Sequence, residues 1–386
     1  MRRRPALSKR DFDHQLREPG AAVYGQRSHW LMLHTDPLLA LLLALLMVAG
    51  LAVLYSAGDS DHGQVRRQLA YMVIGITLML VTAQTPLRLL QRWAWLPYVA
   101  GTLLLLAVEL IGSDAKGARR WLVLGPVRFQ PAELMKIALP LSLSAYLASR
   151  PLPPRLGDLA VAAALMSVPL ALVLIQPDLG TAVLIGAGGG FVFFLAGISV
   201  RFILTVGAVI LGAAPVMWLF VLHDYQKTRI LTLIDPESDK LGAGWNIIQS
   251  TTAIGAGGWT GKGWLQGTQS QLDFLPEGHT DFIIAVLAEE FGFIAVLGLI
   301  CLYALIILRG LAISLGASSM FGRLLAGSIT LTFFVYVFVN MSMVAGLLPV
   351  VGVPLPMVSY GGTSVVTLSI GFGILMAVRS ETGRRG

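Results

Sequence analysis

Three ionisable side chains, those of Glu277, His279 and Asp281, stand close together directly before an apolar run that begins at Ile283. Charged groups are costly to place at a membrane boundary, so this cluster points to a functional site. The alternative is an ordinary helix start, in which Thr280 caps the helix and Asp281 favours its dipole. Taken alone, the cluster does not separate these two interpretations.

The segment before this cluster has the composition of a binding site for phosphate and sugar. It carries three cations, a glycine-rich run and three tryptophans: Arg229, Lys240 and Lys262, residues 255–263, and Trp245, Trp259 and Trp264. Glycine-rich backbone beside Lys and Arg can cradle phosphate, and tryptophan rings suit a sugar face or a membrane interface. The alternative is a flexible loop with interfacial tryptophans. The segment lacks the phosphate-loop pattern of nucleotide-binding proteins, which argues against a nucleotide site.

Polar residues also open three other apolar runs. These segments are Phe129-Gln-Pro-Ala-Glu133, Gln176-Pro-Asp-Leu-Gly180 and Ser359-Tyr-Gly-Gly-Thr-Ser364. A proline followed by an acid is common at helix starts, which is the alternative interpretation of Asp178 and Glu133. Lys136 lies three residues after Glu133 on the same helical face, so the pair would place two charges inside a span. An inward-facing polar cavity explains that pair better than a cap does, and the alternative is an ion pair that serves stability.

Composition identifies the broad class of protein. Of the 386 residues, 55% are hydrophobic and 13% are charged, and the mean hydropathy is +0.75. A membrane-spanning helix needs about 20 mostly apolar residues. Ten such stretches are predicted, at 37–57, 69–85, 94–112, 132–149, 158–175, 179–197, 202–222, 282–308, 324–348 and 358–378. The sequence therefore predicts an all-α polytopic membrane protein with about ten transmembrane helices and a large extracytoplasmic loop between spans seven and eight.

The distribution of charge predicts the orientation. With ten spans, more than half of the 28 Lys and Arg residues fall on the side of both termini, which the positive-inside rule places in the cytoplasm. The predicted organisation is a basic cytoplasmic tail at 1–36, a single membrane domain at 37–380 and a cytoplasmic C-terminus at 381–386. Outer loops are expected at 113–131 and 223–280. Every even-numbered span then begins at the outer surface, so the four polar segments gather on that face.

Net charge and cysteine content argue against a nucleic-acid partner and against cysteine-based sites. The net charge of +7 follows mostly from topology, so it gives no reason to expect a nucleic-acid partner. The single Cys301 rules out a disulfide framework and a thiolate metal site. No metal-ligating residues are predicted.

Five segments together resemble the signatures of the SEDS family, the shape, elongation, division and sporulation proteins of bacteria. They are Ala118–Trp121, Phe129–Glu133 with Lys136, Gln176–Ala182, Leu275–Phe282 with Ala288–Gly292, and Pro354–Ser364. Tyr225 and Gln226 with Arg229, Asp235–Ser238, and Gly267–Leu272 resemble the elongation branch more than the division branch. The resemblance covers roughly 37–380. Gly278 departs from the pattern, because the family often has a larger residue there.

The resemblance implies a peptidoglycan glycosyltransferase that polymerises lipid II into glycan strands during cell elongation. Such a protein sits in the bacterial cytoplasmic (inner) membrane, with its active site at the outer, periplasmic face. Its implied partners are a class B penicillin-binding protein and other membrane and cytoskeletal proteins of the elongation complex. The family's essential Asp corresponds to Asp281, and its central-cavity charge pair corresponds to Glu133 and Lys136.

That reaction assigns roles to the candidate residues. Asp281 is the candidate general base for the acceptor hydroxyl, and one carboxylate suffices because pyrophosphate leaves readily once its charge is neutralised. Lys and Arg side chains or a divalent cation could supply that neutralisation, and no other cofactor is expected. The candidate substrate-binding and cavity residues are Glu133, Lys136, Arg229, Lys262, His279, Asp178, Ser359 and Tyr360.

Two other functions stay open on the sequence. A flippase for a lipid-linked precursor would also have many spans and embedded charges, but it should show polar groups near the bilayer midplane and on both faces. The predicted inner face is nearly bare of acids within the bundle, with Asp158 at a span boundary and Glu381 in the tail. The third interpretation is a non-catalytic scaffold of the elongation complex, in which Asp281 would be only a helix cap.

Overall fold

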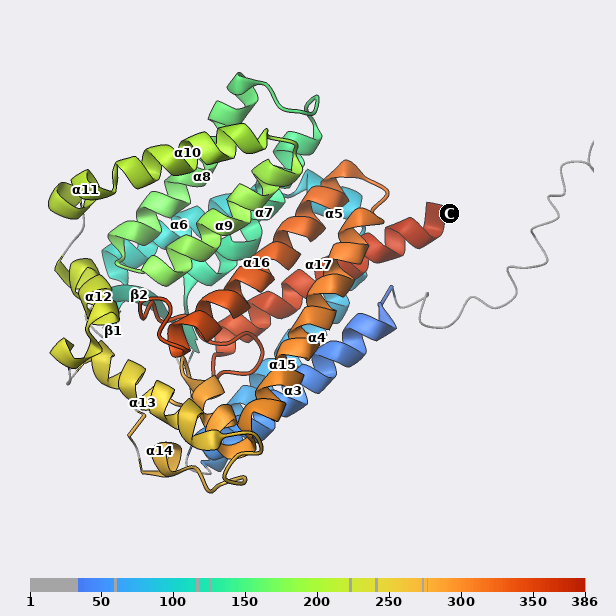
Figure 1. Ribbon diagram of the computed structural model, residues 1–386. Helices are drawn as coiled ribbons and strands as arrows, with labels where there is room; N and C mark the ends of the chain where they lie inside the picture. Colours follow the sequence, from blue (N-terminus) through green and yellow to red (C-terminus); the bar gives the residue numbers. More distant parts are fainter. Residues whose placement is uncertain are drawn as a thin grey trace, which may run out of the picture.

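The structure, a computed structural model, describes residues 34–58, 61–115, 118–124, 127–221, 224–239, 242–272, 274–275 and 277–385. Apart from its last three residues, the predicted tail 1–36 lies outside these ranges. The described chain is mostly helical and its helices run side by side in one bundle (Figure 1). The predicted all-α polytopic fold is therefore confirmed.

Each of the ten predicted apolar stretches coincides with a helical segment. These are α3 (Pro37–Ala57), α4 (His62–Ala83), α6 (Trp95–Ile111), α7 (Pro131–Ala148), α8 (Leu156–Ile175), α9 (Leu179–Leu195), α10 (Val200–Gly212), α15 (Ile283–Leu315), α16 (Met320–Val344) and α17 (Gly362–Arg385). The stretch 202–222 also takes in α11 (Ala214–Val216) and a π-helix at Met217–Val221. The short α5 (Leu87–Arg92) precedes α6.

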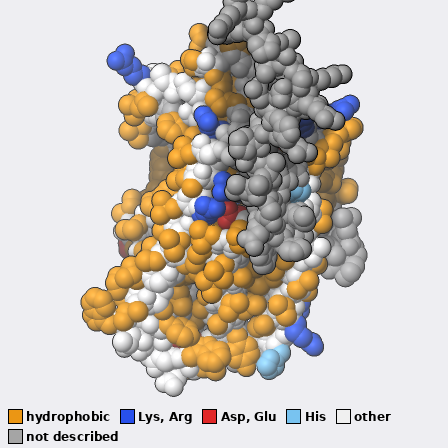
Figure 2. All heavy atoms as spheres, turned by 90° about the vertical axis from the view of Figure 1, so that its right-hand side faces the viewer, with side chains coloured by type: hydrophobic (Ala, Val, Ile, Leu, Met, Phe, Trp, Pro, Cys, Tyr) orange, Lys and Arg blue, Asp and Glu red, His pale blue; other side chains and the backbone are white. Residues whose placement is uncertain are grey.

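Length and composition identify membrane-crossing helices more strictly. Among the described residues, 6 helices are long and apolar enough to cross a membrane, namely α3, α4, α8, α15, α16 and α17. Helices α6, α9 and α10 are apolar but shorter, and α7 carries Glu133 and Lys136. The total of ten spans therefore stays a prediction. On the face seen in Figure 2, hydrophobic side chains cover most of the described surface and charged side chains are few.

Helices α16 and α17 form the centre of the bundle. About two thirds of the apolar window is buried in each of them, 67%, against 17% in α8 and 22% in α4. Helix α16 contacts α7 and α9 on one side and α15 on the other, and α17 packs along α4 (Figure 1). The backbones of α4 and α17 approach closely, because a Cβ added at Gly373 would lie 2.5 Å from the Met79 carbonyl oxygen. Small residues permit such close packing of membrane helices.

The segment at 113–131, predicted as an outer loop, contains a small antiparallel sheet that the sequence analysis did not predict. Its strands are β1 (Ser113–Ala115), β2 (Ala118–Leu124) and β3 (Val127–Phe129), in the order β1-β2-β3. Leu122 pairs with Phe129 across the second ladder. Leu122 is buried while its neighbour Val123 is exposed, as expected for a strand with one face against the protein.

The large loop between α11 and α15 is mostly helical. It contains α12 (Asp224–Ile234), a 3₁₀ turn at Pro236–Asp239, α13 (Ala243–Gly257) and α14 (Thr268–Gln271). Helix α13 packs against α15. The Ser250 hydroxyl donates a hydrogen bond to the Val344 carbonyl oxygen at 3.0 Å, which ties α13 to the end of α16. The described part of the loop is therefore an ordered cap on the bundle.

Helix α15 is broken at Gly292, where φ is 74° and ψ is −174°. The glycine-rich run crosses this break. The amides of Lys262 and Gly263 donate to the carbonyl oxygens of Glu289 and Glu290, at 3.0 and 2.9 Å. The amide of Phe293 in turn donates to the Gly258 carbonyl oxygen at 2.9 Å. A Cβ at Gly261 would lie 2.1 Å from the Glu290 carbonyl oxygen, so this close approach requires glycine.

Candidate functional site

Two loops that are distant in the sequence meet at the site: the turn at 277–282 and the segment at 350–361 that leads into α17. The Ser359 hydroxyl donates a hydrogen bond to the Thr280 carbonyl oxygen at 2.5 Å and accepts one from the Leu355 amide at 2.8 Å. The Tyr360 amide donates to the His279 carbonyl oxygen at 3.0 Å. The structure therefore brings His279, Ser359 and Tyr360 together around the backbone that precedes Asp281.

Asn340 on α16 fixes the same two loops from inside the bundle. Its side-chain amide donates to the carbonyl oxygens of Asp281 and Val353, at 2.8 and 2.7 Å. Asn340 is fully buried. Two buried bonds from one rigid helix define where the Asp281 backbone lies, because each would leave an unsatisfied carbonyl if it were lost.

The carboxylate of Asp281 lies beside Gly352. A Cβ added at Gly352 would stand 3.6 Å from Asp281 Oδ2, and the φ of Gly352 is +72°. Asp281 is half-buried and Gly352 is exposed, so the carboxylate reaches the surface of the site. Because Gly352 has a positive φ and no side chain, it leaves space beside the carboxylate. This geometry suits a base that must contact a hydroxyl of a bound substrate.

Gln68 on α4 anchors the turn into α17. Its side-chain amide nitrogen donates to the Ser359 carbonyl oxygen, and its side-chain oxygen accepts from the Gly361 amide, both at 3.2 Å. Gln68 is fully buried. Because α4 and α17 are closely packed, this pair of bonds links the turn to a tight contact of the bundle.

The Glu133 and Lys136 pair lies inside the bundle, as predicted. Lys136 Nζ lies 2.6 Å from Glu133 Oε1 and 3.1 Å from the Tyr336 hydroxyl, which in turn lies 3.0 Å from the Ser364 hydroxyl. Glu133, Lys136 and Tyr336 are all buried. The ion pair is therefore held within a larger hydrogen-bond network.

A small cavity adjoins this network. It has a volume of about 30 Å³, and both Glu133 and Thr332 line it. Within the described chain, Glu133 Oε2 and the Thr332 hydroxyl are buried without a hydrogen-bond partner. The space fits one water molecule, which would satisfy both groups.

Helix α16 joins the ion-pair network to Asp281. Tyr336 and Asn340 are four residues apart on this helix, so they share one face and stand about 6 Å apart along it. Ser364, at the start of α17, closes the network from the other side. Glu133, Lys136 and the Asp281 loop thus belong to one polar column in the centre of the protein.

Asp178 caps α9 close to this column. Its carboxylate accepts from the Thr181 amide at 3.2 Å and from the Gln130 side-chain amide at 2.8 Å, and Arg120 lies 4.0 Å away. A Cβ on Gly180 would lie 2.7 Å from the Val351 carbonyl oxygen, so α9 begins against the loop that Asn340 holds. The contacts of Asp178 are those of a helix cap. A role of Asp178 in substrate binding stays a prediction.

Lys262 belongs to a different cluster. Its Nζ lies 2.7 Å from Glu289 Oε1, and the same carboxylate accepts from the amides of Thr268, Gln269 and Ser270. Glu289 is fully buried, and the Lys262 side chain is 28% exposed. Lys262 is thus paired with the buried carboxylate of Glu289 on α15. A contact of Lys262 with phosphate stays a prediction.

Arg229 lies on α12, which packs against the 3₁₀ turn and α13. Its side chain is half-buried, and its proposed contact with phosphate also stays a prediction. Over the described ranges, no group of three or more His, Cys, Asp or Glu side chains is placed to hold a metal ion.

The sequence analysis missed the residues that position the site. These are Gln68, Tyr336, Asn340 and Thr332. Two of them left a signal in the sequence, because Tyr336 and Asn340 interrupt an apolar stretch at helical spacing. Gln68 left none, since its two partners lie 291 and 293 residues further along the chain.

Known proteins resemble this chain over nearly its whole length. The family profile FTSW_RODA_SPOVE, described as cell cycle protein, matches residues 30–384. Peptidoglycan glycosyltransferase MrdB of Escherichia coli K12 is 49% identical over 356 residues, covering 92% of this chain and 96% of its own. The probable peptidoglycan glycosyltransferase FtsW of Trichlorobacter lovleyi is 37% identical over 358 residues, covering 89% and 92%.

Solved structures share the fold. A chain from work described as structural coordination of polymerization and crosslinking by a peptidoglycan synthase complex superposes with a TM-score of 0.80 at 33% identity, covering 90% of this chain and 98% of its own. The rod shape determining protein RodA of Thermus thermophilus superposes with a TM-score of 0.68 at 32% identity, covering 89% and 96%.

Proposed function

Because the chain belongs to the FtsW, RodA and SpoVE family of cell cycle proteins, we propose that it acts as a peptidoglycan glycosyltransferase of the RodA type. It is a multi-pass membrane protein, and its relatives named for this activity match most of its length. The substrate is lipid II, a lipid-linked disaccharide-pentapeptide, and the product is a glycan strand. The strand serves cell elongation and the maintenance of rod shape.

In the proposed reaction, Asp281 is the general base. It takes the proton from a sugar hydroxyl of the acceptor as that oxygen attacks the anomeric carbon of the donor. The bond from that carbon to the pyrophosphate-lipid breaks, and the configuration at the carbon inverts. Two observations support this role. The half-buried carboxylate of Asp281 lies beside the bare backbone of Gly352, and the Asn340 side chain holds the backbone of Asp281. A base must be held in place to contribute its full share of catalysis.

The leaving pyrophosphate needs positive charge nearby. We assign this role to Arg229 and Lys262 or to a divalent cation, and we assign Glu133 and Lys136 to the electrostatics of the central cavity. A fixed charge inside a site from which water is excluded stabilises a developing anion more than the same charge in water. His279, Asp178, Ser359 and Tyr360 shape the surroundings of Asp281, as their contacts with the two loops support.

The proposed location is the cytoplasmic (inner) membrane of a bacterium, with the site at its outer face. The positive-inside distribution of Lys and Arg supports this orientation. The proposed partner is a class B penicillin-binding protein that cross-links the strands, together with other proteins of the elongation complex. The similarity to a chain of a peptidoglycan synthase complex supports such a partner.

The test compares wild type with Asp281→Asn, each purified with its class B partner and incubated with labelled lipid II while transpeptidation is blocked. Glycan products are resolved by length. We expect polymer from wild type and a loss of about 10² to 10⁴ in rate for the variant, which is the usual cost of removing a general base. Asn keeps the size of Asp, so folding and partner binding should be unchanged.

Three results would contradict the proposal. Full polymerising activity in Asp281→Asn would remove its role as base. If wild type makes no polymer and instead moves lipid II across liposomes, the chain is a flippase. Loss of partner binding in the variant would indicate a scaffold in which Asp281 is structural.

A further inference from the structure

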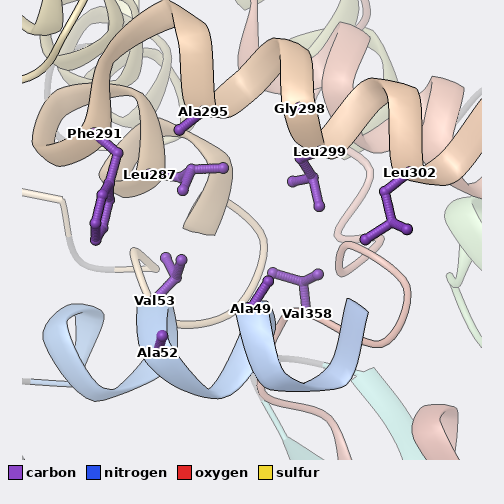
Figure 3. Close-up of a pocket in the computed structure, with 10 residues that line it drawn as sticks. All are labelled: Ala49, Ala52, Val53, Leu287, Phe291, Ala295, Gly298, Leu299, Leu302 and Val358. Carbon is purple, nitrogen blue, oxygen red and sulfur yellow. The ribbon is translucent and has the colours of Figure 1, made fainter. Parts of the chain in front are cut away.

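A groove lies between α3 and α15, and its lining is entirely apolar. Its volume is about 280 Å³. Figure 3 shows Ala52 and Val53 of α3 facing Leu287 and Ala295 of α15, with Gly298 and Val358 further along. Small-molecule sites normally include a few polar groups that orient the ligand, and this groove has none. The chemistry that fits this lining is that of a hydrocarbon.

The groove follows α15 on both sides of the break at Gly292, from Leu287 to Leu302. After the break, its lining residues recur every three or four positions from Ala295 to Leu302, so they form one face of that part of the helix over about 10 Å. Small residues in membrane helices usually allow the backbones to touch. Here Ala49 and Ala52 face Ala295 and Gly298 across open space, and a Cβ built at Gly298 meets no atom within 4 Å. This shape fits an extended chain.

Polar contacts beyond both ends of the groove join the two helices. Beyond Val53, the Ser56 hydroxyl donates to Glu290 Oε1 at 2.5 Å. At the other end, Arg309 Nε donates to Asp36 Oδ1 at 3.2 Å. These two contacts tie α3 to α15 on either side of the groove.

The groove is continuous with the candidate site. Val358 lines it, and the next residue, Ser359, donates its hydroxyl hydrogen bond to the carbonyl oxygen of Thr280. Leu287 also lines it and lies in the first part of α15, six residues after Asp281. The elements that carry Asp281 thus form one wall of the groove. A chain attached to a headgroup at Asp281 can enter it directly.

We propose that this groove binds the polyprenyl chain of the lipid-linked substrate while its headgroup occupies the site at Asp281. This inference rests on the proposed function. Membrane phospholipid has chains of similar chemistry, but only the substrate has a headgroup that belongs at Asp281. A substrate held at both ends is aligned along the membrane normal, with its pyrophosphate at a fixed depth.

The first experiment narrows the groove without touching the site. Ala52→Phe and Gly298→Leu each add a side chain to the open space. Gly190→Leu on α9 is the matched control, because a Cβ there also meets nothing within 4 Å. Polymerisation by the complex with its class B partner is measured with native long-chain substrate and with an analogue that carries a short, water-soluble prenyl chain.

We expect both groove variants to raise KM for the long-chain substrate by roughly fivefold or more, with kcat nearly unchanged, because they remove binding shared by ground and transition states. With the short-chain analogue they should match wild type, and Gly190→Leu should match wild type with both substrates. Unchanged KM for the long-chain substrate would overturn the proposal. So would an equal loss with both substrates, which means that the effect acts through the fold.

The second experiment measures binding without turnover. A photo-crosslinking p-benzoylphenylalanine is placed at Gly298, with Gly190 as control, and the complex is irradiated in liposomes that contain labelled substrate. We expect substrate crosslinks at 298 only, and unlabelled substrate should abolish them. Crosslinks at 298 to phospholipid alone, or to a partner helix, would overturn the proposal. Because crosslinking needs no polymerisation, a failure of the proposed activity in wild type would be seen separately.

Discussion

Asn340 holds Asp281 by its backbone: the side-chain amide of Asn340 lies 2.8 Å from the carbonyl oxygen of Asp281. The same amide bonds Val353, so a single side chain sets the distance between the two loops of the site. The position of the carboxylate therefore depends on a helix in the middle of the bundle. The backbone of Asp281 is held in place before substrate arrives, which favours efficient proton transfer.

The first prediction concerns this contact. Asn340→Asp keeps the shape of the side chain but replaces the donor by an oxygen that faces two carbonyl oxygens. We expect polymerisation to fall roughly 10- to 100-fold, because a displacement of a catalytic group by about 1 Å has effects of that size. The measurement is glycan synthesis from labelled lipid II, with KM and kcat determined separately, and the loss should fall on kcat.

Asn246→Asp on α13 is the control for this substitution, since it makes the same chemical change on a half-buried residue of a different helix. It should leave both constants unchanged. If Asn340→Asp retained the kcat of wild type in a folded protein, Asn340 would not position Asp281.

The second prediction concerns the buried ion pair. Lys136→Met leaves the carboxylate of Glu133 buried and uncompensated, which costs about 3–5 kcal/mol in stability. The double variant Glu133→Gln with Lys136→Met removes both charges, so it should recover a large part of that loss. Thermal unfolding in detergent measures both. A double variant as unstable as Lys136→Met would show that the charge of Glu133 is not the cause.

The third prediction concerns the outer loop. Glu289→Gln weakens four hydrogen bonds from Lys262, Thr268, Gln269 and Ser270, because a neutral amide accepts less strongly than a carboxylate. We expect faster amide hydrogen exchange in α14 and a similar effect from Lys262→Gln. The control is Glu109→Gln, at an exposed position on α6. Unchanged exchange in α14 would mean that this carboxylate does not hold the loop.

The fourth prediction concerns the break in α15. Gly292→Ala forces a side chain onto a residue with φ of +74°, where its Cβ would lie 2.4 Å from the Gly261 amide nitrogen. We expect a loss of at least about 1–3 kcal/mol in stability. Gly298→Ala on the same helix meets open space and should gain about 0.5–1 kcal/mol, because alanine favours helix over glycine. Equal unfolding temperatures for the two variants would contradict this account of the break.

The helices of the bundle could be predicted because each apolar stretch carries its own signal. Those between Pro37 and Leu195 begin and end within a few residues of the predicted bounds, except that α4 begins earlier, at His62. The sheet at 113–129 could not be predicted from the sequence, since its strands are short and only one of its faces is buried. The glycine-rich run at 255–263 had two interpretations, a phosphate cradle or a flexible loop, and neither anticipated its backbone contacts with the break in α15.

The residues of the candidate site were likewise predicted only in part. Asp281, Glu133 and Lys136 were predicted from charges in an apolar setting, and the structure places the pair inside the bundle. Asn340 and Gln68 were missed because their function lies in contacts with distant carbonyl and amide groups. Hydrophobic pattern identifies what is buried, whereas a buried amide is informative only when its partners are known.

The backbone pairing across Gly292 has a consequence for the chain as a whole. The passages at 257–263 and 289–294 are joined by main-chain hydrogen bonds that satisfy each other. The segment between them, including Asp281, is therefore closed at its base. Insertions or deletions in α12 or the 3₁₀ turn leave that closure intact, so the outer surface is free to diverge in length and shape while the residues around Asp281 keep their places.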